Sequence, residues 1–173
     1  YFPDRAALVG AVLDEVERHF VSLFDRARGT HEDPVRVLVN LSIAYAASLE
    51  THFDHAKIVL SWSALVDDAD VVERLGRIFL GYLSLVEGTI REGIGRRLIP
   101  SDIDVELAAW TFVGYSSTVG AAKFFGRPPE WIVRLQIALL RNLLGHRAVD
   151  RVLAATKSTA LKAPPRAITA RRI

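Results

Sequence analysis

Histidine and acidic residues are the first side chains to test for chemistry, and their spacing argues against a metal site. The histidines are His19, His31, His52, His55 and His146. His52 and His55 could share a helical face, but Asp54 between them favours the cap of a new helix, and two ligands without a third make no zinc site. In the run Asp67-Asp68-Ala69-Asp70 the next residue is Val71, where a magnesium-binding aspartate motif needs an acid. We therefore expect no metal and no cofactor.

Motifs for covalent or phosphate chemistry are also missing from the sequence. It contains no Gly-rich phosphate loop, no hydrolase nucleophile elbow and no Glu-x-x-His pair. It contains no cysteine, which excludes a thiol nucleophile, a disulfide framework and cysteine-ligated zinc. We expect a protein that is not an enzyme and that resides in the reducing cytoplasm.

Aromatic and hydroxyl side chains recur on the segments between the first and the last helix. Such side chains combine apolar area with a hydrogen-bonding group and suit a small, mostly apolar ligand. Plain packing in the core is the alternative for each of them. The candidate ligand-binding residues are Tyr45, Trp62, Phe79, Tyr82, Trp110 and Tyr115.

Helical periodicity extends over almost the whole chain, and no alternating strand pattern of useful length appears. With 173 residues, half of them apolar, the chain can bury one core. We predict an all-α bundle of about six to seven helices. The first helix should begin after the cap Asp4 and end at Gly29. Its apolar face comprises Leu8, Val12, Val16, Phe20, Leu23 and Phe24.

The second predicted helix is apolar on every side. Asp33-Pro34 is a strong start signal, and the helix should run to about His52. Residues 37–49 have no charge, which indicates a central helix surrounded by others. Its polar side chains need partners there, either a ligand or water in a cavity, or neighbouring protein groups. These side chains are Asn40, Ser42, Tyr45 and Ser48.

The later helices follow from similar signals. A short helix is expected over residues 54–65, a long one from the acidic cluster to Gly95, and another after a capping-box-like start at Ser101 and Asp104. Residues 107–125 are too weakly hydrophobic for a membrane span. Further helices are predicted over 129–144, after two prolines, and over 148–157.

The last two long helices have faces suited to a partner. Gly114, Ser117, Thr118 and Ala121 form a stripe of small residues at helical spacing, which lets another helix approach closely. The next helix has an apolar arc too wide for one contact, and it includes Ile132, Leu135, Leu139 and Leu143. We predict a homodimer in which these two helices of each protomer form a four-helix bundle.

Charge is divided unevenly along the chain. Residues 157–173 contain five basic residues and no acid, and we expect this tail to be flexible. The rest, with 17 basic and 20 acidic residues, is net −3. Because residues 1–156 lack a basic cluster, nucleic-acid binding would have to come from the tail or from a segment outside this chain.

Two passages resemble a known family. The run Tyr1-Phe2-Pro3-Asp4-Arg5-Ala6-Ala7-Leu8 resembles the segment after the recognition helix in TetR/AcrR-type bacterial transcriptional regulators, where Tyr-Phe-Pro-Ser-Lys-x-x-Leu patterns are usual. Arg5 stands at the position of that Lys. Residues 87–104 resemble the family passage in which a helix ends in a Gly-containing turn and a capped helix follows. The predicted order of helices also matches.

The resemblance implies a domain organisation and a mechanism. Residues 1–3 would be the end of a DNA-binding domain whose helix-turn-helix lies outside this chain, and residues 4–156 would form the ligand-binding and dimerisation domain. Tyr1 and Arg5 would lie at the operator DNA. A small effector in the helical core would change the spacing of the two DNA-binding domains and release the operator. A dimerisation module without effector, or a helical-bundle enzyme or cofactor carrier, is the alternative.

Overall fold

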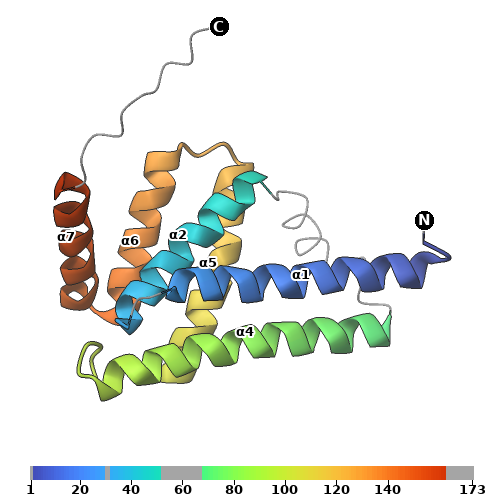
Figure 1. The fold of residues 1–173 in the computed structure, drawn as a ribbon, viewed down its shortest axis with the longest axis horizontal. Helices are drawn as coiled ribbons and strands as arrows, with labels where there is room; N and C mark the ends of the chain where they lie inside the picture. Colours follow the sequence, from blue (N-terminus) through green and yellow to red (C-terminus); the bar gives the residue numbers. More distant parts are fainter. Residues whose placement is uncertain (1, 30–31, 52–67, 163–173) are drawn as a thin grey trace, which may run out of the picture.

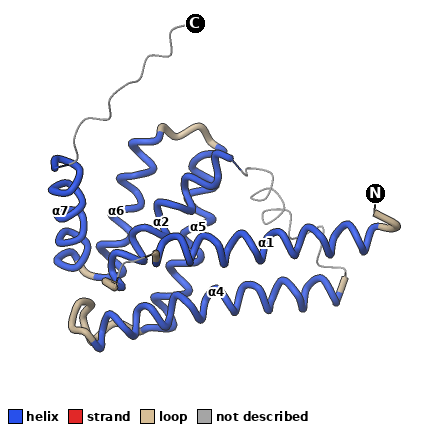
Figure 2. Tube along the Cα trace, viewed as in Figure 1, coloured by secondary structure: helices blue, strands red, loops and turns tan. Residues whose placement is uncertain are grey.

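The computed structural model describes residues 2–29, 32–51 and 68–162. These residues form six α-helices and no strand, which confirms the all-α prediction (Figures 1 and 2). The predicted helix over residues 54–65 lies outside the described residues. The helices are α1 (Arg5–Arg28), α2 (Pro34–Thr51), α4 (Ala69–Gly95), α5 (Val105–Phe124), α6 (Pro129–Leu144) and α7 (His146–Lys162).

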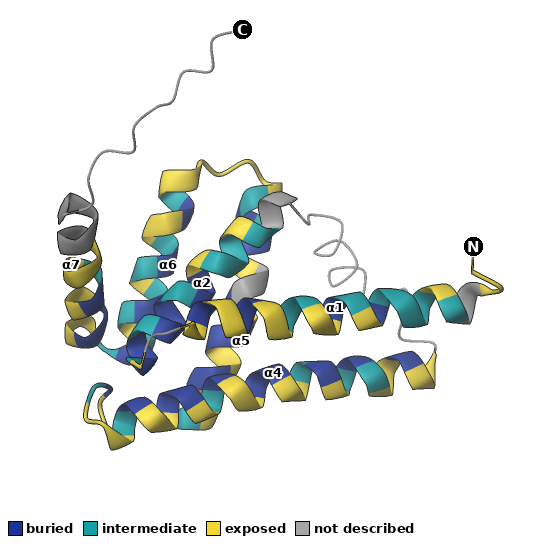
Figure 3. Ribbon diagram, in the orientation of Figure 1, coloured by how far each residue is buried: buried dark blue, intermediate teal, exposed yellow. Residues whose placement is uncertain are grey.

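The boundaries of α1 are set by local signals in its sequence. The Asp4 carboxylate accepts a hydrogen bond from the Ala7 amide at 2.8 Å, and thereby caps the first turn. Gly29 ends the helix in a backbone conformation with φ 45°, which suits a residue without a side chain. Both ends are as predicted. Leu8 of the predicted apolar face, however, is 44% exposed, because the first turns of α1 extend beyond the other described helices (Figure 3).

Helices α1 and α4 lie side by side and run in the same direction (Figure 1). Leu13 of α1 packs there against Leu75 and Ile78 of α4 in a small apolar cluster. The Arg74 guanidinium binds the Gly10 carbonyl oxygen at 3.3 Å and also pairs with the Asp14 carboxylate. This clamp joins the projecting half of α1 to α4.

Helix α2 is the centre of the fold, as its lack of charge predicted. It contacts every other helix that the structure describes. Val35, Leu38 and Leu41 are completely buried in the main core. The prediction that other helices surround α2 holds for one side only, because Ile43 on another side is 54% exposed. Polar groups on the buried side need hydrogen-bond partners within the protein.

The connection from α4 to α5 is a tight turn. The Gly93 carbonyl accepts hydrogen bonds from the amides of Leu98 and Ile99, and Arg97 has a positive φ of 58°. Asp104 caps α5 by accepting from the Leu107 amide at 3.0 Å. The predicted start at Ser101 is therefore wrong, because Asp104 is itself the N-cap and α5 begins at Val105.

The last helix is longer than predicted. Helix α7 runs from His146 to Lys162, so the first residues of the basic segment 157–173 are helical rather than tail. Val149 and Val152 place α7 in the main core, and Arg151 pairs with Asp33 at 2.6 Å. Among the described helices none is long and apolar enough to cross a membrane, which agrees with the rejection of a span at residues 107–125.

Candidate ligand-binding core

Three of the predicted ligand residues come from three helices and turn into the interior. Tyr82 of α4 is 5% exposed, Tyr115 of α5 is buried, and Tyr45 of α2 is half-buried. Tyr45 packs against both the main core and the smaller cluster that contains Tyr115. We call Tyr45, Tyr82 and Tyr115 the tyrosine cluster.

A buried hydrogen-bond network lies beside Tyr115. The Gln136 amide of α6 donates to the Ser42 carbonyl oxygen at 2.8 Å and to the Ser42 hydroxyl at 3.2 Å. The Ser42 hydroxyl in turn donates to the Tyr115 hydroxyl at 3.5 Å. Neighbouring protein groups thus satisfy Ser42 and Tyr115, which is the alternative that the sequence left open for the polar groups of α2.

Tyr82 differs from Tyr115 in its hydrogen bonding. Its hydroxyl is buried and has no hydrogen-bond partner among the described residues. Its ring lies 5.0 Å, centroid to centroid, from the ring of Phe20 on α1. A buried hydroxyl without a partner costs about 1–3 kcal/mol, so such a group is rarely left unpaired unless a ligand or water meets it.

All three phenols are neutral at physiological pH. Burial raises the pKa of Tyr45 to about 12, and burial raises that of Tyr115 to about 12 although Ser42 and Gln136 lower it. Burial, with a smaller contribution from nearby Tyr45, also raises the pKa of Tyr82. The tyrosine cluster therefore offers hydrogen bonds but no charge, which suits an uncharged polar group on an otherwise apolar ligand.

The other predicted ligand residues lie elsewhere. Phe79 and Trp110 pack together with ring centroids 5.1 Å apart. Phe79 borders the main core, whereas Trp110 is 45% exposed, so its ring is at the surface and not in the interior. Trp62 lies outside the described residues.

The predicted dimer residues differ in how far they are buried. Gly114 and Thr118 are exposed on α5, on the same face as Leu107, which is 64% exposed. Ile132 is buried within its own chain, in the cluster of Tyr115, and presents little surface to a partner. Ala121, Leu135, Leu139 and Leu143 are half-buried, and the Ser117 side chain lies outside the described residues.

Neither a DNA contact nor a metal site is defined by the described residues. Tyr1 and the side chain of Arg5 lie outside them. No group of three or more His, Cys, Asp or Glu residues in the described ranges could hold a metal ion.

Gln136 and Phe20 belong to this core but were not proposed from the sequence as site residues. Gln136 is four residues from Ile132 and four from Leu140, and all three lie on the buried face of α6. An uncharged polar residue in line with buried apolar ones is the signal that could have identified it. Phe20 was assigned to the apolar face of the first helix, and nothing in its spacing indicates which ring it meets.

Comparisons with protein-family models, with curated proteins and with solved structures found no match to this chain.

Proposed function

We propose that this chain is the effector-binding and dimerisation domain of a TetR-type transcriptional regulator of the cytoplasm. The proposal rests on the two resembling passages, at residues 1–8 and 87–104, and on the helix order. A helix-turn-helix domain joined to residues 1–3 would bind operator DNA, and the chain would act as a homodimer through α5 and α6. A small, mostly apolar effector in the helical core would release the DNA.

The observation that supports an effector most directly is the unpartnered Tyr82 hydroxyl. A ligand with one uncharged oxygen could accept or donate a hydrogen bond there, with apolar contacts around it. Tyr82 also contacts Phe20 of α1, the helix that would lead to the DNA-binding domain. A ligand that displaces the Tyr82 ring would therefore act directly on α1.

The energy required of this switch is small. A difference in ligand affinity between the DNA-binding and released states typically amounts to 1–3 kcal/mol, or about 5- to 150-fold. The free energy gained or lost when one aromatic contact repacks and one buried hydroxyl gains a partner is of that order. The proposal thus needs no large rearrangement of the core.

The test uses the complete gene product. Its binding to DNA fragments from the neighbourhood of its own gene is measured by mobility shift, with the 173-residue chain as a control that should not bind. We expect a specific fragment to be bound and to be released by one member of a panel of apolar ligands. A reading frame without a helix-turn-helix, or a complete protein that binds no such fragment, would reject the proposal. DNA binding without release by any ligand would instead favour the module without effector.

A further inference from the structure

A hollow of about 450 Å³ lies between α1 and α2, apart from the tyrosine cluster. This volume is in the range of small-molecule sites, about 300–1,000 Å³. Helices α1 and α2 form a hairpin and diverge from their connection (Figure 1). We call this hollow the α1–α2 groove. Its lining residues are His19, Leu23, Arg26 and Ala27 of α1 and Asn40, Ile43, Ala44, Ala47 and Ser48 of α2.

The groove has an apolar middle and polar ends. Leu23 and Ala27 are buried beneath it, while Ile43 in its wall is 54% exposed. At one end Arg26 lies next to Ala27, whose carbonyl oxygen accepts a hydrogen bond from Asn40 at 3.5 Å. This bond places the end of α1 beside the first half of α2. Because the two helices form a hairpin, His19 lies at the opposite end of the groove. A molecule that covers Ile43 would remove an exposed apolar side chain from water.

The described lining of the groove carries a positive charge. None of these lining residues is acidic, and Arg26 is the permanent cation among them. The Arg26 Nε donates to the Ser22 carbonyl oxygen of its own helix at 3.1 Å, and no ion pair of its guanidinium is found among the described residues. The acids of α1 line a different hollow, which Arg26 also borders; they are Asp14, Glu17 and Asp25. An anionic group therefore fits the end formed by Arg26 and Asn40.

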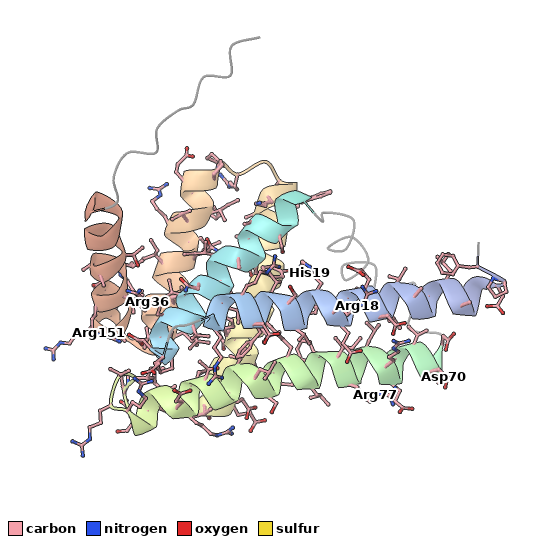
Figure 4. All side chains as sticks on the ribbon, viewed as in Figure 1. Arg18, His19, Arg36, Asp70, Arg77 and Arg151 are labelled. Carbon is pink, nitrogen blue, oxygen red and sulfur yellow. The ribbon has the colours of Figure 1, made fainter. Side chains whose placement is uncertain are left out.

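The length of the groove sets the size of its occupant. His19 and Arg26 are seven residues apart on α1, which is about 10 Å along a helix axis. Figure 4 shows His19 on the side of α1 that faces α2. A straight chain of about eight carbon atoms spans this distance and matches the apolar middle formed by Leu23, Ile43 and Ala44.

We infer that the α1–α2 groove binds a single-chain apolar carboxylate, with its carboxylate at Arg26 and Asn40 and its hydrocarbon chain over Leu23 and Ile43. Binding of the carboxylate does not depend on the proposed function, but a regulatory effect of that binding does. A ligand wedged between α1 and α2 would move α1, so this site would give a regulator a second way to sense a metabolite.

The test is calorimetric titration of the 173-residue chain with octanoate and with octan-1-ol, which have the same chain length but differ in charge. We expect octanoate to bind at least about tenfold more tightly than octan-1-ol. Arg26→Gln should abolish that preference by weakening octanoate binding much more than octan-1-ol binding. Arg18→Gln is the matched control, because Arg18 is an exposed cation of the same helix that pairs with Glu15 and does not line the groove.

A second variant tests the position of the hydrocarbon chain. Ile43→Trp fills the groove from an exposed site and should weaken both probes at least about tenfold without loss of helicity in circular dichroism. The inference is overturned if octanoate produces no heat, if it binds no better than octan-1-ol, or if Arg26→Gln and Arg18→Gln behave alike. These results are independent of DNA binding, so they would leave the proposed function standing.

Discussion

The ring of Phe20 on α1 lies 5.0 Å from the ring of Tyr82 on α4, with 41° between their planes. This contact joins a buried phenol, whose hydroxyl has no partner among the described residues, to the first helix of the chain. Aromatic pairs of this kind contribute about 0.5–1.5 kcal/mol beyond the area they bury. The contact should therefore persist when the hydroxyl is removed, and this permits a test of the hydroxyl alone.

Tyr82→Phe should stabilise the protein. It removes a buried hydroxyl that is desolvated without compensation and keeps the ring against Phe20, so the free energy of unfolding should rise by about 1 kcal/mol. Tyr115→Phe is the matched control, because the Tyr115 hydroxyl accepts a hydrogen bond from Ser42. That variant should lose about 1 kcal/mol. Urea denaturation followed by circular dichroism measures both, and equal destabilisation of the two variants would show that Tyr82 is already paired.

Alanine should have opposite effects on stability at two glycines of α4, Gly88 and Gly93. A Cβ at Gly93 would overlap the Ile99 side chain and lie 2.8 Å from its Cγ1, whereas a Cβ at Gly88 meets nothing within 4 Å. Gly93→Ala should cost about 1–3 kcal/mol, because Ile99 is buried in the main core and cannot yield freely. Gly88→Ala should stabilise α4 by about 0.5–1 kcal/mol. Thermal denaturation compares them, and a neutral Gly93→Ala would contradict the close packing of Ile99.

The sequence predicted helix ends well because their signals are local. Asp4, Pro34 and Pro129 each act within one turn, and the helices begin beside them as expected. Local signals do not show which helix faces pack against each other. The Ser42–Gln136 pair joins residues 94 apart in the chain, and no spacing rule reaches that far. Residue type placed Trp110 with the ligand residues, but type does not say which side of α5 the other described helices cover, and Trp110 is 45% exposed.

The Asp33 carboxylate makes the free energy of unfolding depend on pH in the acidic range. Burial alone would raise the pKa of its carboxyl, but the hydrogen bond and charge of Arg151, with the Val35 and Arg36 amides, together lower it below its ordinary value. Because the pKa is lower in the folded state, this stabilisation is present above about pH 4 and is lost as the pH falls through the folded pKa. Asp33→Asn should therefore show a shallower loss of stability below pH 4.

The Asp33 experiment compares urea midpoints at pH 7 and pH 3. Asp150→Asn is the control at a more exposed carboxylate, which pairs with Arg141 at 2.6 Å. Both substitutions remove one salt bridge of α7, but the Asp150 side chain is 51% exposed and that of Asp33 only 24%. If the two variants show the same pH dependence, the Arg151 pair has no special effect on acid stability.

The exposed face of α5 predicts how the proposed dimer can be broken. Gly114 and Thr118 are exposed one turn apart, and Leu107 extends the same face with 64% of its surface accessible. If this face packs against its copy, Thr118→Arg places two like charges near the twofold axis and should weaken the dimer at least tenfold. Sedimentation velocity at micromolar concentration measures the change. Ser84→Arg, on an exposed position of α4, adds the same charge and should leave the dimer intact. A monomeric wild-type chain would contradict the dimer itself. Equal dissociation of both variants would contradict an interface on this face of α5.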